Sequence, residues 1–552
     1  MSHKSLIFAI LTIIASVGLA AAQSSSRQSY AVERALDEYR NGNNAAAIEW
    51  LDKELKANPQ NGDAYLILTA IRYEAEQYGK ALTTINNAIA YLPKRDKAMT
   101  AVAYGFKGDI MRALCDTVAA TANYDQAIKL DPANVSLYIS RGNLYFEQNN
   151  YKSSEKDFRQ VTEMEPGNPI GYIGLAQNFM AQKNYDKAIS TLTHAIRLDP
   201  EKSETYAFRA EAYLDQAKWA EAADDIIKAF SIGWNDKAFD QMTNIPDEAL
   251  PTMKAKLLTQ ANKNSEQPIW YYFMGTLSLT KNNYREAIKY YTKVNEKKVD
   301  SGILEVIATC YFYLGDYSYA LKQVDKAIDL KPADEDLYLL KGNIYNELGN
   351  RPAAIAQLDK YLEMVPDSFF GYYRRGWFRD GQGDRKGAID DYSVSIALNP
   401  GYAYAYVGRG RNYDLLGQKD AAVADYNKAI ELDSIPSKNS CAQYAYFFLG
   451  RPDKAEDFMK RYLENSDEKD LAGCNYDAAC LYSLMGDVDK SLYHLREAFK
   501  NGWRRFAHLS VDRDLENIRH TQQFKDLVKE FHELQEKENV QPDSSDGQAF
   551  EL

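Results

Sequence analysis

The sequence has little cysteine, histidine or proline. Its 552 residues include only 5 cysteines, 6 histidines and 16 prolines. The two nearest cysteines, Cys474 and Cys480, are six positions apart, which is not the spacing of a zinc site or a redox motif. An odd number of cysteines also leaves at least one thiol unpaired within a single chain. We therefore expect these cysteines to be buried helix residues, in a fold that disulfides do not hold together.

Sequence motifs of catalysis are also missing. There is no phosphate-binding P-loop, no GxSxG nucleophile motif and no HExxH zinc motif. Gly381, Gly383 and Gly387 superficially resemble a nucleotide-binding loop, but the third glycine is one residue late and no strand precedes it. No histidine has the histidine partner four residues away that a helical zinc site requires. The sequence therefore predicts no catalytic residues, no cofactor and no metal.

Long apolar runs are confined to the N-terminus. Leu6–Leu19 follows Lys4 and precedes the small residues Ala20–Ala22, which is typical of a secretory signal peptide cleaved after Ala22. The run is shorter than the ~20 residues that a membrane-spanning helix needs. We expect residues 1–22 to be a signal peptide, and the mature protein to be periplasmic or secreted with no stable membrane span. An uncleaved N-terminal membrane anchor is the alternative.

Positive charge is in deficit. The formal net charge is −12 at pH 7, and an acidic chain is repelled by phosphate backbones, so nucleic acid is not an expected partner. A hydrophobic content of 45% is normal for a packed protein. Because 552 residues far exceed one hydrophobic core, the chain must contain several domains or a repeat array.

A repeat is what the sequence does contain, and its prolines mark it. Successive prolines are mostly 34 residues apart, and six residues after most of them stands one of the 41 tyrosines. Four residues after that tyrosine the side chain is usually Gly or Ala, and sixteen after it an Ala recurs. The prolines concerned are Pro59, Pro93, Pro132, Pro166, Pro200, Pro332, Pro366 and Pro400.

We call the recurring Pro, Tyr, small residue and Ala the anchors of the repeat, and each has a structural reason. Proline cannot continue a helix, so it separates one helix from the next. The tyrosine and the small residue four positions later share one helical face, where the ring fills the core and the small residue admits a neighbouring helix backbone. Gly or Asn in phrases such as EQNNY and YLGDY can adopt the left-handed conformation that ends the first helix of each pair.

This 34-residue pattern resembles the tetratricopeptide repeat (TPR) family. The resemblance implies an all-α fold, a right-handed superhelical solenoid of helix–turn–helix repeats. Some repeats depart from the pattern, since Ala31 replaces the aromatic of the first repeat and Thr69 the small residue of the second. Five extra residues around 94–98 lengthen the approach to the third repeat.

The register divides the chain into segments. We predict about six repeats within residues 23–236, a helical spacer at 237–267 that lacks the anchors, and about seven repeats within 268–505. Residues 506–535 resemble the closing cap of exported bacterial family members, which a solenoid needs to cover its last apolar face. Residues 536–552 are acidic and rich in small residues, which predicts a disordered tail. The spacer either continues the solenoid, which we favour, or bends it.

The resemblance implies partner binding through the concave groove, which the first helix of each repeat lines. Residues one and five positions after the tyrosine are expected to face this groove. Chaperone-binding members carry Lys and Asn at these positions, whereas Ile139 and Leu339 replace the Lys here, so binding of chaperone tails is not expected. The candidate partner-binding residues are Asn143, Gln177, Asn343, Tyr373, Arg374, Trp377 and Arg411.

The most distinctive stretch of the groove is 370–411, where Tyr373 and Trp377 stand among several arginines. Aromatic and arginine side chains together are typical of protein-interface hot spots, and arginines favour acidic or C-terminal carboxylate segments. In the alternative interpretation, the tyrosines only pack and the arginines pair with local aspartates such as Asp380 and Asp414.

Three classes of function are open at this stage. The leading hypothesis is a non-enzymatic scaffold for protein or peptide partners in cell-envelope assembly or secretion. The second is a glycan-binding or polysaccharide-handling accessory protein, in which tyrosines stack on sugars. An enzyme is disfavoured because no nucleophile, base or metal set is clustered. The oligomeric state is not predicted.

Overall fold

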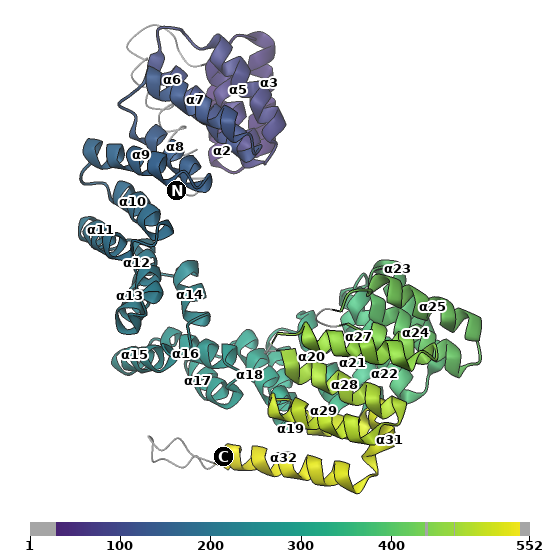
Figure 1. Ribbon diagram of the computed structural model, residues 1–552. Coiled ribbons are helices and arrows are strands. Elements are labelled where there is room, and N and C mark those ends of the chain that lie inside the picture. Colours follow the sequence, from purple (N-terminus) through teal and green to yellow (C-terminus); the bar gives the residue numbers. More distant parts are fainter. Residues whose placement is uncertain (1–28, 437–439, 468–469, 541–552) are drawn as a thin grey trace. The chain divides into compact units, whose positions relative to one another are not determined.

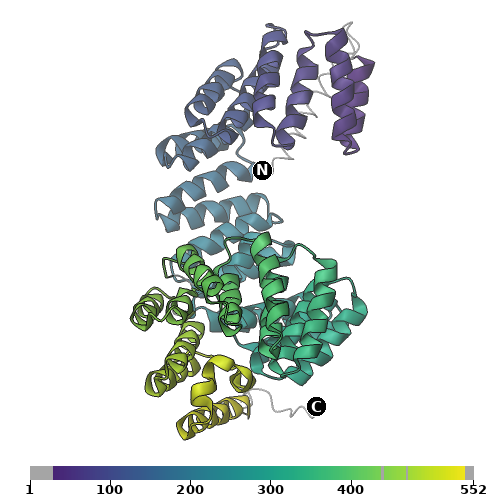
Figure 2. The same ribbon diagram turned by 90° about the vertical axis from the view of Figure 1, so that its right-hand side faces the viewer.

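The computed structural model describes residues 29–436, 440–467 and 470–540 (Figures 1 and 2). The predicted signal peptide and residues 541–552 of the predicted tail lie outside these ranges. The described residues form α-helices and short 3₁₀ turns without a β-strand, which confirms the all-α fold. None of the described helices combines the length and apolarity that a bilayer span requires. The chain divides between Lys256 and Leu257 into two compact units, unit 1 and unit 2.

Unit 1 is a stack of helical hairpins. In each hairpin the first helix packs against the second, and the second packs against the first helix of the next hairpin. The helices are α2 (Tyr30–Arg40), α3 (Asn44–Ala57), α4 (Gly62–Glu74), α5 (Tyr78–Tyr91), α6 (Lys97–Ala113), α7 (Thr117–Leu130), α8 (Val135–Glu147), α9 (Tyr151–Met164), α10 (Pro169–Ala181), α11 (Tyr185–Leu198), α12 (Ser203–Asp215), α13 (Trp219–Ile232), the short α14 (Asp236–Thr243) and α15 (Leu250–Lys263), which crosses the boundary between the units.

Unit 2 repeats the same hairpin, and two short helices and a 3₁₀ turn then lead to the long last helix α32. The helices are α16 (Ile269–Thr280), α17 (Tyr284–Lys297), α18 (Ser301–Leu314), α19 (Tyr317–Leu330), α20 (Glu335–Glu347), α21 (Arg351–Met364), α22 (Phe369–Gln382), α23 (Arg385–Leu398), α24 (Ala403–Leu415), α25 (Lys419–Leu432), α26 (Ala442–Phe448), α27 (Pro452–Glu464), α28 (Leu471–Met485), α29 (Val488–Lys500), α30 (Phe506–Val511), the 3₁₀ turn η2 (Arg513–Leu515), α31 (Glu516–Arg519) and α32 (Gln522–Val540). Helix α32 therefore includes the first residues of the predicted tail. Within each unit the hairpins form a right-handed superhelical solenoid.

The six-residue spacing from proline to tyrosine has a structural cause. The tyrosine hydroxyl donates a hydrogen bond back to the proline carbonyl, for example from Tyr206 to Pro200 at 3.1 Å and from Tyr338 to Pro332 at 3.0 Å. This bond ties the turn before the first helix to the helix itself. The same bond recurs from Tyr138, Tyr172 and Tyr406 to Pro132, Pro166 and Pro400.

The small residue four positions later makes room for a side chain of the second helix, and at Gly342 also for its backbone, since the Ala354 carbonyl oxygen would lie 3.3 Å from an added Cβ. A Cβ added at Gly410 would lie 2.8 Å from Cε1 of Tyr426. One added at Gly342 would lie 2.4 Å from Cδ2 of Leu358. In these repeats the second helix thus inserts a large side chain against the first helix, and this contact holds the hairpin together.

Arginine–aspartate pairs also join the two helices of several hairpins. Arg209 on α12 holds Asp225 on α13 with two hydrogen bonds of 2.7 Å, and its Nη1 reaches Thr193 of the preceding repeat at 2.9 Å. Arg409 on α24 makes the same contacts with Asp425 at 2.8 Å and with Ser393 at 3.1 Å. These arginines are therefore structural in both units.

Candidate functional site: the groove of unit 2 and its C-terminal segment

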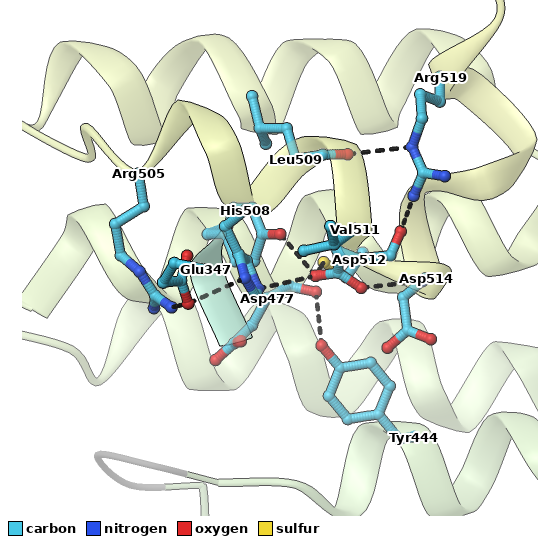
Figure 3. Close-up of polar contacts among 12 residues, drawn as sticks. Glu347, Tyr444, Asp477, Arg505, His508, Leu509, Val511, Asp512, Asp514 and Arg519 are labelled. Atoms are coloured by element: carbon cyan, nitrogen blue, oxygen red, sulfur yellow. Dashed lines mark hydrogen bonds and ion pairs between the residues drawn. The ribbon is translucent and has the colours of Figure 1, made fainter. Parts of the chain in front are cut away.

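The first helices α20, α22 and α24 carry Asn343, Trp377 and Arg411 at equivalent positions, and we call the face that bears these residues the unit-2 groove. A segment from the end of the same unit lies against it. This segment, residues 505–514, comprises Arg505, α30 and the start of η2, and we call it segment 505–514 (Figure 3). It is separated from its contacts on the groove by more than 100 positions in sequence.

Glu347 is the first contact point. It ends α20, is only 3% exposed, and receives a hydrogen bond from Nη2 of Arg505. Its Oε1 also lies 3.3 Å from Nδ1 of His508. Burial by itself would raise the pKa of Glu347, but the neighbouring His508 and Arg505 hold that pKa below its ordinary value. Glu347 is thus a buried carboxylate whose charge is balanced by segment 505–514.

His508 connects this carboxylate to a second one. Its Nε2 lies 3.4 Å from Oδ2 of Asp512, which also accepts a hydrogen bond of 2.5 Å from the Tyr476 hydroxyl of α28. Burial would lower the pKa of His508, but Asp512 and Glu347 raise it above the ordinary value. The same contacts hold the pKa of Asp512 well below its usual range. The imidazole of His508 therefore lies between two carboxylates, which favour its protonated form.

Three further contacts join the segment to the groove. Arg411 Nη1 donates to Asp514 Oδ1 at 2.7 Å, and Arg513 Nη1 donates to both the carbonyl and the carboxylate of Asp380 at 3.0 Å. Arg351 Nη2 donates to the Val511 carbonyl at 3.1 Å. A cavity of only about 50 Å³ remains between the two surfaces, so the segment fills this part of the groove closely.

The segment is also fastened to the end of its own unit. Arg519 Nε donates to the Leu509 carbonyl at 3.0 Å, and its Nη2 donates to the Asp512 carbonyl (Figure 3). Leu509, Leu515 and Ile518 are buried in one apolar cluster with residues of α28, α29 and α32. One side of the segment thus belongs to the last repeat and the other side faces the groove.

The five predicted site residues of unit 2 are brought together here. Arg374 donates to Oδ1 of Asn343, and its guanidinium lies 4.9 Å from the centre of the Trp377 ring. The Trp377 ring lies 6.1 Å from that of His508. Tyr373 belongs to an adjoining aromatic cluster, 5.0 Å from Tyr402. Arg411 pairs with Asp514 as described above.

Arg374 differs from the other arginines of the stretch. It makes no ion pair with any residue that the structure describes, and its Nε is buried without a hydrogen-bond partner. Burial lowers its pKa. By contrast, Arg375 and Arg379 both pair with Asp391 of α23, at 2.6 and 2.9 Å.

The alternative interpretation of the arginines is therefore half right. Arg375, Arg379 and Arg409 are structural, but their partners are Asp391 and Asp425, whereas Asp380 pairs with Arg513 and Arg385. Arg374 and Arg411 lie on the groove itself and do not belong to these arginine–aspartate pairs between the two helices of a hairpin.

The predicted residues of unit 1 have different surroundings. Asn143 on α8 and Gln177 on α10 are half-buried, and neither side-chain amide makes a hydrogen bond within the described ranges. Further along, α14 covers the next groove position, because Lys237 pairs with Glu211 at 2.8 Å and Gln241 donates to the Ala207 carbonyl at 2.9 Å.

Sequence reasoning missed the carboxylates and the histidine of this network. Glu347 and Asp380 lie about one helical turn beyond the positions predicted to face the groove. His508, Asp512 and Asp514 lie in the predicted cap, whose density of charged residues was the available signal. Which groove the cap enters depends on the superhelical path, which no local pattern specifies.

A cysteine thiol also lies beside this network. Cys480 Sγ lies 3.7 Å from Oδ2 of Asp512, but burial and this negative charge raise the pKa of its thiol, which disfavours a nucleophilic thiolate. Within the described ranges, no group of three or more His, Cys, Asp or Glu side chains is placed to hold a metal ion.

The fold and the groove define a helical-repeat protein in which residues 505–514 lie against the first helices α20, α22 and α24 of the same unit. Models of the tetratricopeptide repeat match residues 32–98, 108–149, 145–210, 271–296, 307–369 and 403–435. The chain belongs to the tetratricopeptide repeat family.

Solved structures of this family are similar to parts of the chain. The crystal structure of MamA is 26% identical, covers 29% of this chain and 95% of its own, and has a TM-score of 0.28. A tetratricopeptide repeat protein from Parabacteroides merdae is 20% identical, with coverage of 51% and 97% and a TM-score of 0.34. A curated relative, a chloroplastic protein of Arabidopsis thaliana, is 39% identical over 59 residues, which are 11% of this chain and 18% of that protein.

Proposed function

We propose that this protein is a non-enzymatic scaffold that binds protein or peptide partners in its concave groove. The observation that carries the proposal is the unit-2 groove, which already holds a polypeptide segment through Glu347, Asp380 and Arg411. Membership of a family of protein-interaction repeats supports the same function.

In unit 1 the proposed binding surface is the groove around Asn143 and Gln177. The half-buried Ile139 lies one helical turn before Asn143 on α8, whereas Ile173 of α10 is buried in the core. Amide side chains can bond the backbone of an extended peptide while Ile139 contacts one of its apolar side chains. This surface is proposed as the site for an external partner.

The proposed setting is the cell envelope or the exterior, where the protein would serve assembly or secretion. This part rests on the signal-like run Leu6–Leu19 and on the small residues that follow it. N-terminal sequencing of the protein recovered from its own cells should begin at Gln23. An intact N-terminus that fractionates with membranes would favour the anchored alternative.

Site-specific cross-linking tests the binding surface. A photoreactive amino acid is placed in the full-length protein at Gln177, with the exposed Lys156 of the second helix α9 as the matched control. We expect one discrete protein adduct at Gln177, absent at Lys156, and lost when Asn143→Arg is added. Equal adducts at both positions, or an adduct that Asn143→Arg leaves unchanged, would contradict groove binding.

A glycan-binding function is the second candidate. Tyr313 and Tyr319 are each 44% exposed, and Tyr313 stacks with Tyr284 at 5.1 Å. Exposed aromatic rings can also stack on sugars. Retention on immobilised polysaccharide that is lost in Tyr313→Ala and Tyr319→Ala variants would favour this function over peptide binding.

A further inference from the structure

A hollow of about 550 Å³ lies between two successive second helices of unit 2, α17 and α19, over the first helix α18, and we call it the α17–α19 pocket. Its floor is apolar and consists of Leu304, Ile307 and Tyr311 of α18. Thr292 of α17 and Gln323 of α19 stand on its two sides. Its lining comes from α17, α18 and α19, so it is a different surface from the unit-2 groove, which α20, α22 and α24 carry.

The pocket lies where other repeats place the ring of the anchor tyrosine. The ring of Tyr338 is only 7% exposed and belongs to one apolar cluster with Ile328 of the preceding second helix and Leu358 of its own second helix. Leu304 stands 34 positions before Tyr338 and holds the same position in its own repeat. Because leucine is smaller than tyrosine and has no ring, the space between the two second helices is not filled in this repeat.

A lysine of the second helix faces the anchor ring in three repeats. It stands 22 positions after the tyrosine. The pairs are Tyr206 with Lys228, Tyr271 with Lys293 and Tyr338 with Lys360, with Nζ 5.9, 5.0 and 5.5 Å from the ring centre. Lys326 holds this position after Leu304, and it lines the pocket. A cation is attracted to the face of an aromatic ring, but this repeat supplies leucine in place of the ring.

The arginine–aspartate pair of the hairpin is also replaced here. Arg409 stands three positions after its anchor tyrosine, and its partner Asp425 stands sixteen positions further on. The residues at these positions in the repeat of Leu304 are Ile307 and Gln323, and both line the pocket. An apolar side chain thus replaces a guanidinium at the floor, which favours an apolar group as the occupant.

Apolar surface continues beyond the pocket at both ends. At one end Tyr311 stacks with Tyr319 at 5.4 Å, and Tyr319 is 44% exposed. At the other end Val299 and Leu330 are 60% and 53% exposed. Exposed apolar surface bordered by polar residues is typical of protein-interaction sites. Aliphatic side chains such as Val299 and Leu330 suit the apolar side chains of a polypeptide better than they suit a sugar.

We propose that the α17–α19 pocket binds an aromatic side chain of a partner protein, which takes the place that the anchor tyrosine has in other repeats. Leu304 and Ile307 would contact the ring, and Lys326 would lie over its face. The amide of Gln323 and the hydroxyl of Thr292 can bond the backbone of the segment that carries the ring. The inference deepens the proposed scaffold function and rests on it, because it names the chemistry of a partner at a second surface.

The first experiment uses the full-length protein and p-cresol, which is the side chain of tyrosine. Binding is followed by NMR at an isotope-labelled δ1 methyl group of Ile307. Methylcyclohexanol is the matched control compound, since it has the same size and hydroxyl but no aromatic ring. We expect p-cresol to shift the Ile307 signal and methylcyclohexanol to bind about fivefold more weakly. Lys326→Met, which removes the cation and keeps the length of the side chain, should weaken p-cresol binding about threefold.

Leu304→Tyr is the decisive variant, because it supplies the ring that other repeats carry at this position. It should abolish the response to p-cresol. Ile307→Arg with Gln323→Asp closes the pocket in a second way, by restoring the pair seen at Arg409 and Asp425, and keeps the proposal testable if Leu304→Tyr does not fold; its loss of p-cresol binding is read from the labelled methyl groups of Leu304. Equal binding of the two compounds, or p-cresol binding that survives in both closed variants, would overturn the proposal.

The second experiment identifies the partner in the cells that make the protein. A photoreactive amino acid is placed at Gln323, and the matched control is Gln357, which stands 34 positions later in the repeat that contains Tyr338. We expect a discrete protein adduct at Gln323 that is absent at Gln357 and is lost in Leu304→Tyr. Mass spectrometry of the adduct should locate an aromatic residue of the partner beside the cross-link, and its replacement by alanine should abolish the adduct.

An adduct within the chain itself, or one that survives loss of the partner's aromatic residue, would contradict the proposed occupant. Cross-linking at Gln177 reports on the unit-1 groove and should be unchanged in Leu304→Tyr. Failure at Gln323 with a normal adduct at Gln177 would therefore reject this pocket and leave the scaffold proposal standing.

Discussion

The two units contain the same hairpin but differ in the turn between its two helices. Between the two helices of each hairpin, one residue adopts the left-handed conformation. In unit 1 this residue is usually not glycine, as at Asn149, Lys183 and Ala217, whereas in unit 2 it usually is, as at Gly383 and Gly417. Non-glycine residues pay a backbone cost in this conformation, so the turns of unit 1 are the more strained.

The grooves differ as well. The unit-2 groove is filled by segment 505–514, whereas Asn143 and Gln177 of unit 1 have no hydrogen-bond partner within the described ranges. The shared anchors therefore determine the hairpin but not what the groove holds. Residues between the anchors, such as Glu347 and Asp380, hold segment 505–514 in one groove.

The largest expected effect comes from removing the carboxylate that receives the segment. Glu347→Ala leaves Arg505 and His508 without their buried anion, and breaking a buried ion pair typically costs about 3–5 kcal/mol. Hydrogen exchange should show this loss of stability as faster exchange in unit 2, with no change in unit 1.

Glu530→Ala is the control for this change, since Glu530 pairs with Arg496 at an exposed position and the pair should contribute less than about 1 kcal/mol. Equal effects of the two substitutions would show that the buried network contributes nothing special to unit 2.

A second pair of substitutions tests what the units share. Arg209 in unit 1 and Arg409 in unit 2 each donate two hydrogen bonds to an aspartate and one to a hydroxyl of the preceding repeat. Replacing either by alanine leaves a buried aspartate unpaired, and about 2–3 kcal/mol should be lost in both cases because the arginines are partly exposed. Hydrogen exchange measures both losses. If only one of the two substitutions reduced protection from exchange in its unit, the two hairpins would not be equivalent.

Much of this could be predicted from sequence because the anchors act locally. The spacing from Pro200 to Tyr206 fixes one hydrogen bond and hence the start of one helix. The sequence predicts Trp377 and Arg411 in the groove because each stands five positions after the tyrosine of its repeat. The contact of Arg411 with Asp514 crosses 103 positions and depends on the accumulated rotation of several repeats, which no single repeat encodes.

The stability of unit 2 should depend on pH through His508. The groups that face this side chain are Glu347, Arg505, Asp512, Trp377, Trp503 and Tyr476. Its pKa is raised, so its contribution is complete below the ordinary value of 6.5 and is lost as the pH rises through the raised pKa. The pKa of Glu347 is lowered, so its contribution is complete above 4.5 and is lost as the pH falls through the lowered pKa. Attachment of the segment should therefore be strongest between about pH 4.5 and 6.5.

The measurement is the difference in unfolding free energy of unit 2 between the unaltered protein and His508→Gln, followed from below 6.5 upward through the raised pKa of His508. The buried Asp477 also titrates there, since burial raises its pKa to about 7, but it is present in both proteins and largely cancels in the difference. A difference that does not change with pH would show that folding leaves the pKa of His508 unshifted, and one that shrinks as the pH falls would show that folding lowers it.

The smallest expected effect sharpens the comparison of turns. Ala217 and Gly417 stand at the same place in their hairpins, with φ of 55° and 76°. Gly417→Ala should destabilise its hairpin by about 1 kcal/mol, and Ala217→Gly should stabilise its hairpin by a similar amount. A Cβ at Gly417 would have no atom within 4 Å, so the cost there is one of backbone conformation and not of steric overlap. Local hydrogen exchange in α12–α13 and α24–α25 measures both changes, and effects of the same sign would contradict turn strain as the difference between the units.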